Sequence, residues 1–214
     1  MAEVTLYTNP QSRGRIARWM LEEVGADYDV QVIDFTRGRD PAYLAVNPMG
    51  KVPTIVHSHC IVTEAAAICA YLADAFPDAG LAPPVDRRSD YYRWLFFAAG
   101  PLEQAVTSNA LGWTPSEKQE TMVGFGDYDR AIDTIEGAVA GLGEDRWLTG
   151  DRFTAADLYV GAHLSWGTAF GSIPRRDAFT AFVDRVTARP AAQRASALDD
   201  ALVAEWQAKQ DATT

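Results

Sequence analysis

The sequence has few residues of the kinds that build metal sites or disulfide frameworks. Its 214 residues include only two cysteines, Cys60 and Cys69, nine positions apart, and this spacing matches no zinc-ligand pattern. We expect both to be small buried hydrophobic residues rather than nucleophiles, in a protein of a reducing compartment. The three histidines, His57, His59 and His163, lack a carboxylate at any recognisable metal-binding spacing, so no metal is expected.

Long apolar runs and basic clusters are also missing. No apolar run approaches the length of a membrane span, and the first six residues do not have the pattern of a secretory signal. The chain has 19 Lys and Arg against 29 Asp and Glu, a net charge of −10, and no basic block that could neutralise phosphates. The acidic balance indicates solubility. We expect a cytoplasmic protein with neither nucleic acid nor a membrane as a partner.

What remains is an ordinary globular composition, 48% hydrophobic and 22% charged, in a chain long enough for one large or two small domains. The first 76 residues alternate between strand and helix patterns, and their first three elements predict a parallel βαβ unit. This order resembles a thioredoxin-like half. The predicted elements are strand 4–7, helix 13–24 closed by Gly25, strand 28–35, strand 53–56, strand 60–62 and helix 63–76.

After a proline- and glycine-containing linker, every pattern is helical. Gly100 and Pro101 predict a kink or a break in the first helix. Thr154 and Asp157 have the spacing of a capping box, a structural feature rather than a catalytic one. The apolar stripes of the other helices run over residues 92–106, 122–142 and 179–186, the last ended by Pro190, with a frayed tail expected after about Gln207.

The most informative stretch runs from Asn47 to Val56 and precedes a helix that opens on Thr63-Glu64. Proline has no N–H for a sheet ladder, so Pro53 belongs at the first residue of a strand or at an edge. It leaves the N–H and C=O of Val52 free for a contact outside the sheet. With a carboxylate at the next helix N-terminus, these groups would form a receptor for a peptide-like ligand.

The motif Asn-Pro-x-Gly-x-Val-Pro at residues 47–53, followed by Thr-Glu-Ala-Ala-Ala-Ile at residues 63–68 and then Tyr-Leu, resembles the glutathione-binding half of the cytosolic glutathione S-transferases, and the chain as a whole has the same order and length. The resemblance implies a glutathione S-transferase fold, with an N-terminal thioredoxin-like α/β domain and an all-α C-terminal domain. The implied boundaries are residues 1–77, a linker at 78–88, and residues 89–214.

The same resemblance implies which residues hold glutathione. Val52 would offer its backbone to the cysteinyl part, across a cis bond to Pro53. Glu64 would meet the α-amino group, and Lys51 would pair with the glycyl carboxylate. Ala65 lacks the hydroxyl that commonly follows the acidic residue, so only its backbone N–H is left for the γ-glutamyl carboxylate, a loss of about 0.5–1.5 kcal/mol.

A glutathione thiol must become a thiolate to act as a nucleophile at neutral pH. The loop from Thr8 to Ser12 would deliver the thiol to the start of the first helix, where partial positive charge favours an anion. Ser12 and Tyr7 are the catalytic candidates, with Thr8 and Asn9 as further donors. Ser12 can equally be a plain helix cap, and a longer loop separates Tyr7 from the helix.

The resemblance implies an enzyme that transfers glutathione to a small hydrophobic electrophile, working as a homodimer with Tyr91, Tyr92 and Trp94 near the twofold seam. The electrophile pocket is expected around Phe97, Gln104, Trp113 and Trp166, although such aromatics are also common core residues. A glutathione-dependent disulfide reductase or peroxidase and a non-catalytic binding or scaffold protein remain as alternatives. Nothing in the sequence names the electrophile.

Overall fold

The computed structural model describes residues 2–38, 40–143 and 145–211 and contains two compact units. The first unit comprises the residues up to Gly80 together with those from Ala188 on, and the second runs from Leu81 to Thr187. The sequence-based boundary placed everything after residue 88 in one helical domain. In the structure, the last segment of the chain packs with the first unit instead.

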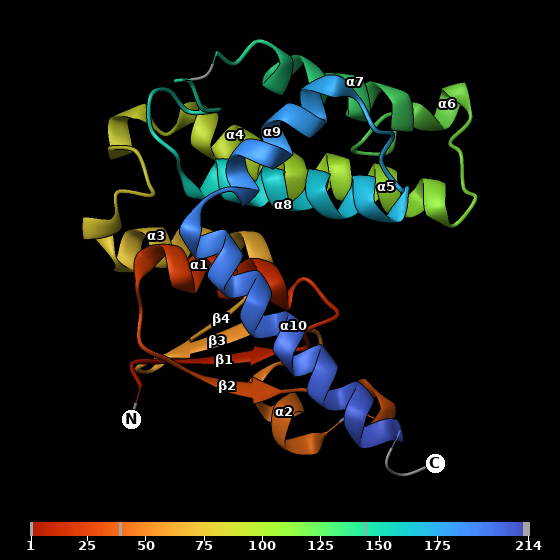
Figure 1. The fold of residues 1–214 in the computed structure, drawn as a ribbon. Helices are drawn as coiled ribbons and strands as arrows, with labels where there is room; N and C mark the ends of the chain where they lie inside the picture. The colour runs from red at the N-terminus through yellow and green to blue at the C-terminus, as the bar shows by residue number, and fades with distance from the viewer. Residues whose placement is uncertain (1, 39, 144, 212–214) are drawn as a thin grey trace. The chain divides into compact units, whose positions relative to one another are not determined.

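The first unit is built on a four-stranded sheet of order β2-β1-β3-β4 (Figure 1). β1 and β2 are parallel, as the βαβ pattern predicts, and the other two pairs are antiparallel. The second strand ends at Val32 rather than Phe35, because Asp34 accepts a hydrogen bond from the N–H of Thr36 and starts a 3-10 turn there. The strands are β1 Val4–Thr8, β2 Tyr28–Val32, β3 Thr54–His57 and β4 Cys60–Thr63.

Figure 1 shows α1 (Gly14–Val24) and α3 (Ala65–Ala75) on one side of this sheet and the short α2 (Pro41–Val46) on the other. α1 ends at Gly25 in the left-handed conformation, as predicted. α2 was not predicted, because its six residues are too few for a periodic pattern. Asp40 caps it by accepting a hydrogen bond from the N–H of Ala42.

The long helix α10 (Pro190–Asp211) was also not predicted, and it packs along α1. The helix begins at Pro190. Proline is favourable at the first position of a helix, because the N–H that it lacks would have no partner within the helix there. Many of its apolar residues are alanines, so the stripe is weak. Arg18 of α1 and Asp199 of α10 hold the two helices together through a buried ion pair of 2.9 Å.

The second unit is helical. At Gly100 and Pro101, where a kink or a break was predicted, a π-helical segment, Ala98–Leu102, interrupts the α-helix. The prediction for residues 122–127 was wrong: Met122 is 80% exposed, and the helix starts only at Tyr128, after Asp127 accepts from the N–H of Arg130. The helices are α4 Ser89–Phe97, α5 Glu103–Ala110, α6 Glu117–Glu120, α7 Tyr128–Ala140, α8 Ala155–Phe170 and α9 Asp177–Thr187, with 3-10 turns elsewhere at Phe35–Arg37, Pro77–Ala79 and Val85–Arg87.

The expectation that both cysteines are buried was wrong in part. Cys69 is buried, which raises the pKa of its thiol, but Cys60 is exposed because β4 is an edge strand of the sheet. Tyr91 and Trp94, expected near a subunit seam, are buried on the inner face of α4 with 1% and 7% of their surface exposed. Only Tyr92 of that group is exposed.

The capping box at the start of α8 is present. The fully buried Asp157 carboxylate accepts from the backbone N–H groups of Thr154 (2.9 Å) and Leu148 (2.8 Å) and from the Thr154 hydroxyl (2.8 Å). Burial nevertheless raises the pKa of Asp157 from 3.8 to about 6, while these donors and the charge of Arg185 lower it in part.

This raised pKa predicts a pH dependence of stability. The pKa of Asp157 is near 3.8 in the unfolded state and about 6 in the folded state, so between these pH values the folded protein binds more protons. Protonation of Asp157 therefore stabilises the fold fully below pH 3.8, and this stabilisation is lost as pH rises through 6. We expect the free energy of unfolding, relative to the non-titrating Asp157→Asn variant, to increase by about 1 kcal/mol when pH falls from 7 to 5. Urea denaturation of both proteins measures it; a difference independent of pH would contradict the assignment.

Candidate functional site

The strand register brings three separate segments to one end of the sheet. Tyr7 near the end of β1 lies opposite Thr54 at the start of β3, and Thr54 lies opposite Thr63 at the end of β4. The loop after β1, the residues before β3 and the residues after β4 therefore emerge at the same edge. These segments contain Ser12, Lys51 to Pro53, and Glu64 with Ala65, which the sequence analysis assigned to one site.

The peptide bond between Val52 and Pro53 is cis, as expected from the resemblance. Pro53 is buried and Val52 is half-buried. Among the described residues, no hydrogen bond engages the Val52 N–H or C=O. Both groups are thus available to a ligand with a peptide backbone.

Glu64 has a backbone conformation that L-residues rarely adopt, with φ 65° and ψ 118°. Its side chain is exposed and makes no capping bond to α3, although it stands at the N-cap. Ala65, with 7% of its surface exposed, begins the helix, and no acidic residue occupies the first turn. The arrangement places a carboxylate beside unfilled helix N–H donors, which suits a ligand group carrying both an ammonium and a carboxylate. A strained residue of this kind is typical of functional sites.

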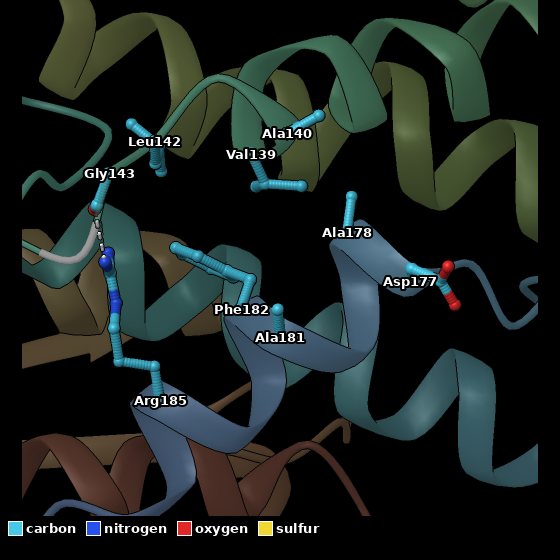
Figure 2. Close-up of a pocket in the computed structure, with 9 residues that line it drawn as sticks. All are labelled: Val139, Ala140, Leu142, Gly143, Asp177, Ala178, Ala181, Phe182 and Arg185. Atoms are coloured by element: carbon cyan, nitrogen blue, oxygen red, sulfur yellow. Dashed lines mark hydrogen bonds between the residues drawn. The ribbon is translucent and has the colours of Figure 1, made fainter.

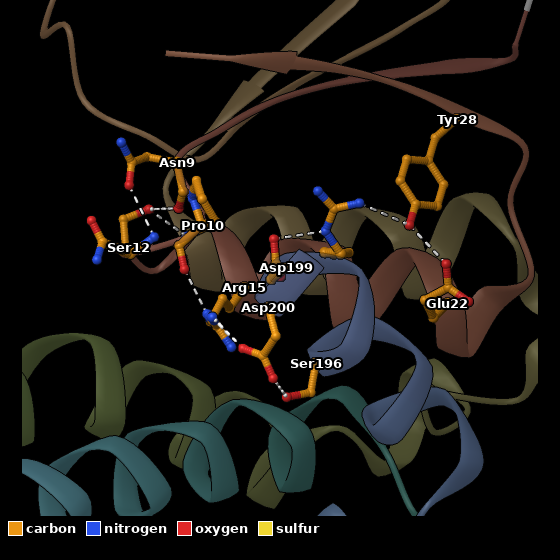
Figure 3. A network of polar contacts seen from close by, with 12 residues as sticks. Asn9, Pro10, Ser12, Arg15, Glu22, Tyr28, Ser196, Asp199 and Asp200 are labelled. Carbon is orange, nitrogen blue, oxygen red and sulfur yellow. Dashed lines mark hydrogen bonds and ion pairs between the residues drawn. The ribbon is translucent and has the colours of Figure 1, made fainter. Parts of the chain in front are cut away.

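The loop after β1 is held from both sides (Figure 3). Asn9 donates to the Ile33 carbonyl (3.0 Å) and accepts from the N–H of Gln11 (2.9 Å), which anchors the loop to the end of β2. Arg15 donates to the Pro10 carbonyl (2.6 Å) and pairs with Asp200 of α10 (2.7 Å). The unpredicted helix α10 thus supports the loop through Arg15.

The Ser12 hydroxyl lies where the loop enters α1. It donates to the Asn9 carbonyl (2.7 Å) and accepts from the N–H of Gly14 (3.0 Å). The Asn9 carbonyl also accepts the backbone N–H of Ser12 (3.1 Å), so it stays satisfied if the hydroxyl turns toward another acceptor. Ser12 lies one residue before Arg13, the N-cap of α1, which makes no side-chain cap bond. The Ser12 hydroxyl thus supports the turn into the helix, and its proton can be redirected.

Tyr7 points to the other face of the sheet. Thr8 is fully buried against α1, where a Cβ on Gly14 would lie 1.9 Å from its hydroxyl oxygen. Because side chains alternate along a strand, Tyr7 faces α2, and its ring stacks on that of Tyr43 at 5.4 Å between centroids. This separates Tyr7 from the N-terminus of α1.

A carbonyl clamp next to Val52 was missed by the sequence analysis. Tyr43 and Asn47 both donate to the Lys51 carbonyl, the second at 2.8 Å, and both contact the hydroxyl of Thr54 at 2.9 and 3.1 Å. Asn47 belongs to the recognised motif, but its turn signal did not indicate this contact. The Lys51 side chain itself is exposed.

The four predicted electrophile-pocket residues all belong to the second unit. Gln104 and Trp113 line a pocket of about 450 Å³, where Trp113 meets Phe125 edge-on at 6.0 Å. Phe97 instead packs edge-on against Trp94, and Trp166 packs against Phe170. The remaining lining residues are Glu103, Thr107, Ser108, Val123 and Gly124.

Another pocket of about 450 Å³ lies between the end of α7 and α9 (Figure 2). Its walls are mainly apolar, and at one side Arg185 donates to the Gly143 carbonyl (2.9 Å) and covers the Trp147 ring at 3.7 Å. None of the residues predicted to act on a ligand lines it.

Within the described ranges, no group of three or more His, Cys, Asp or Glu side chains is placed to hold a metal ion. No helix in the part of the chain that the structure describes is both long enough and apolar enough to cross a membrane.

A mixed four-stranded sheet with α1 and α3 on one face, α2 on the other and a cis-proline before β3 defines a thioredoxin-like domain, here accompanied by a helical unit. The family models of the glutathione S-transferase N-terminal and C-terminal domains match residues 2–74 and 93–190. The chain therefore belongs to the glutathione S-transferase family and, with both domains present, is an enzyme of that class.

Individual relatives agree with this membership. Glutathione S-transferase GstA of Escherichia coli O157:H7 is 31% identical over 94% of this chain and 98% of that protein. A glutathione transferase structure from Methylococcus capsulatus has a TM-score of 0.74 at 28% identity, and a sphingomonad glutathione S-transferase complexed with glutathione has 0.73 at 26%. Each alignment covers 92% of this chain and 98% of the other.

Proposed function

We propose that this protein conjugates glutathione, through its sulfur, to a small hydrophobic electrophile. One observation carries the proposal: Val52 and Glu64 lie at the same end of the sheet. The N–H and C=O of Val52, which precedes the cis bond to Pro53, make no hydrogen bond among the described residues, and Glu64 has a strained backbone. Glutathione supplies the nucleophilic thiolate. The chain's own residues bind the tripeptide, orient it and lower the pKa of its thiol.

Each part of the tripeptide meets a group of matching chemistry. The Val52 N–H and C=O pair with the cysteinyl backbone, and Glu64 receives the α-amino group in a charge-assisted hydrogen bond. The Ala65 N–H at the start of α3 receives the γ-glutamyl carboxylate, where the helix terminus favours negative charge. Lys51, exposed on the turn before β3, pairs with the glycyl carboxylate.

Ser12 is the residue that stabilises the thiolate. In the structure its hydroxyl donates to the neutral carbonyl of Asn9. A hydrogen bond from the same hydroxyl to a thiolate is stronger, because the thiolate is charged. The N–H of Gly14 that donates to the Ser12 oxygen polarises the hydroxyl and makes it a better donor. Tyr7 faces α2 and stacks on Tyr43, which favours Ser12 over Tyr7 for this role.

The electrophile site includes Gln104 and Trp113. Their pocket offers an aromatic pair for stacking and a side-chain amide for orientation, as small-molecule sites commonly do. Phe97 and Trp166 are proposed to act only through packing in the helical unit.

The alternatives have less support. A non-catalytic scaffold protein would not require the strained backbone of Glu64 or the available N–H and C=O of Val52, because such strain is typical of functional sites. A glutathione-dependent disulfide reductase or peroxidase would use the same glutathione site, and activity on a mixed disulfide without activity on aryl halides would favour it. Cys60 gives this alternative no added support, because it pairs with His57 at the other end of the sheet from Thr54.

Glutathione binding is the most direct test. Because a ligand bound only by the native state stabilises it by RT ln(1 + [L]/Kd), reduced glutathione at about 100 times its Kd should stabilise the protein by about 2.7 kcal/mol. We expect a rise in melting temperature with millimolar glutathione and none with the same concentrations of free glutamate, cysteine and glycine. No shift with glutathione would exclude the proposed function.

A further inference from the structure

The carbonyl of Lys51 is held by two buried side chains that come from α2 and the residue that ends it. We propose that Tyr43 and Asn47 are positioning residues of the glutathione site, which hold the Lys51 carbonyl and so set the direction of the Val52 N–H. This inference rests on the proposed function, because the Val52 backbone matters only if a peptide-like ligand binds there.

The physical link is the planarity of the peptide unit. The carbonyl of Lys51 and the N–H of Val52 belong to one rigid plane and, across a trans bond, point in opposite directions. Donors that hold the carbonyl toward α2 therefore direct the N–H away from α2. Pro53 has no N–H, so the orientation of this single donor depends on the preceding peptide plane.

The two donors are well placed for this task. Tyr43 and Asn47 have only 4% and 3% of their surface exposed, and Thr54, which contacts both, is fully buried. A carbonyl oxygen has two lone pairs, and Tyr43 and Asn47 occupy both. The Asn47 side-chain oxygen accepts the N–H of Met49 (3.1 Å), so the amide nitrogen is the atom that faces Lys51.

Tyr7 has a place in the same arrangement. Its ring stacks on Tyr43 at 5.4 Å with an interplanar angle of 28°, which restricts the ring that carries the donating hydroxyl. Burial raises the pKa of Tyr43, which keeps the hydroxyl protonated as a donor. Tyr7 therefore supports the site by packing, without contact with the sulfur.

The test is steady-state kinetics with chlorodinitrobenzene and two thiol substrates, glutathione and γ-glutamylcysteine. The change is Tyr43→Phe, which keeps the ring and its stack and removes one donor. We expect KM to rise roughly tenfold for both thiols, the size of one lost hydrogen bond in a binding site, with kcat and the KM for chlorodinitrobenzene within about threefold of wild type. Asn47→Asp, which places an acceptor opposite the carbonyl, should act in the same direction.

Two controls separate positioning from other causes. Tyr28→Phe also removes a part-buried tyrosine hydroxyl, bonded to Glu22 at 2.7 Å in the same unit, and should leave both KM values unchanged. Lys51→Ala should raise the KM for glutathione but not that for γ-glutamylcysteine, which lacks the glycyl carboxylate. A positioning defect affects both thiols, because both carry the cysteinyl backbone.

The outcomes are distinct. Wild-type protein that neither binds glutathione nor uses it would overturn the proposed function and this inference with it. If the wild type is active and both Tyr43→Phe and Asn47→Asp have KM values for the two thiols within twofold of the wild-type values, the inference alone is overturned. A fall in kcat together with a higher KM for chlorodinitrobenzene would show general damage to the fold and also count against positioning.

Discussion

Ser12→Ala is expected to slow glutathione transfer by roughly 10²–10³ at pH 6.5, by analogy with the removal of one oxyanion-hole donor, and far less at pH 9. Without the hydroxyl, the thiol of bound glutathione has a higher pKa, so fewer molecules carry the thiolate at the lower pH. The affinity for glutathione should change little, because Val52, Glu64 and Lys51 hold the rest of the tripeptide. Initial rates across this pH range, together with spectroscopic titration of the bound thiolate, measure both effects.

The capping role of Ser12 predicts a different result. Its oxygen accepts from the N–H of Gly14, and the loss of that cap alone would cost about 1 kcal/mol of stability and leave the pH–rate profile unchanged. Tyr7→Phe is the paired variant, and we expect it to keep the thiol pKa of the wild type. If Tyr7→Phe shifts that pKa and Ser12→Ala does not, the assignment of Ser12 is wrong.

Glu64→Gln is expected to raise the Kd for glutathione roughly 10–100-fold, since hydrogen bonds to charged groups contribute about 1.5–3 kcal/mol. Gln has the same shape but no charge to offer the α-amino group of the tripeptide. Because the side chain is exposed and makes no capping bond, the free energy of unfolding should stay within about 0.5 kcal/mol. Calorimetric titration with glutathione and urea denaturation give the two quantities.

Glu64→Gly separates strain from binding. Glycine adopts a positive φ without steric cost, so this variant should be more stable than the wild type by about 1 kcal/mol and yet bind glutathione at least as weakly as Glu64→Gln. Such a result would show that the fold maintains an unfavourable backbone at Glu64 for the sake of the ligand. A Glu64→Gln variant with wild-type affinity would instead remove Glu64 from the site.

Prediction from sequence succeeded where the chemistry is local. Pro53 after Val52, Glu64 at a helix start and the Thr154–Asp157 capping box each depend on a few neighbouring residues, and the structure contains all three. The kink at Pro101 follows in the same way from its missing N–H.

Prediction failed where burial depends on distant partners. Cys60 was expected to be buried, but β4 forms the edge of the sheet and leaves Cys60 exposed. Met122 was assigned to a helix that begins only after Asp127. Strand order and the facing of a helix are set by the whole fold, which hydrophobic spacing does not specify.

The sequence by itself determined the order of strands and helices in the first 76 residues and, through its resemblance to the glutathione S-transferases, the fold class and the candidate glutathione contacts. The turn at Asn47 and the strand start after Pro53 depend on neighbouring residues and could be predicted locally. Only the tertiary structure decided how these contacts are supported. The register of Tyr7, Thr54 and Thr63 brings three loops to one end of the sheet. Tyr43 and Asn47 donate hydrogen bonds to the Lys51 carbonyl. Arg15 bonds both to Asp200 of α10 and to the Pro10 carbonyl, and so connects α10 with the loop before α1. The Arg15–Asp200 pair joins distant parts of the chain, so no local pattern encodes it. Tyr43 and Asn47 lie only eight and four residues from Lys51, but their contacts depend on how α2 and the turn before β3 fold, which hydrophobic spacing does not specify.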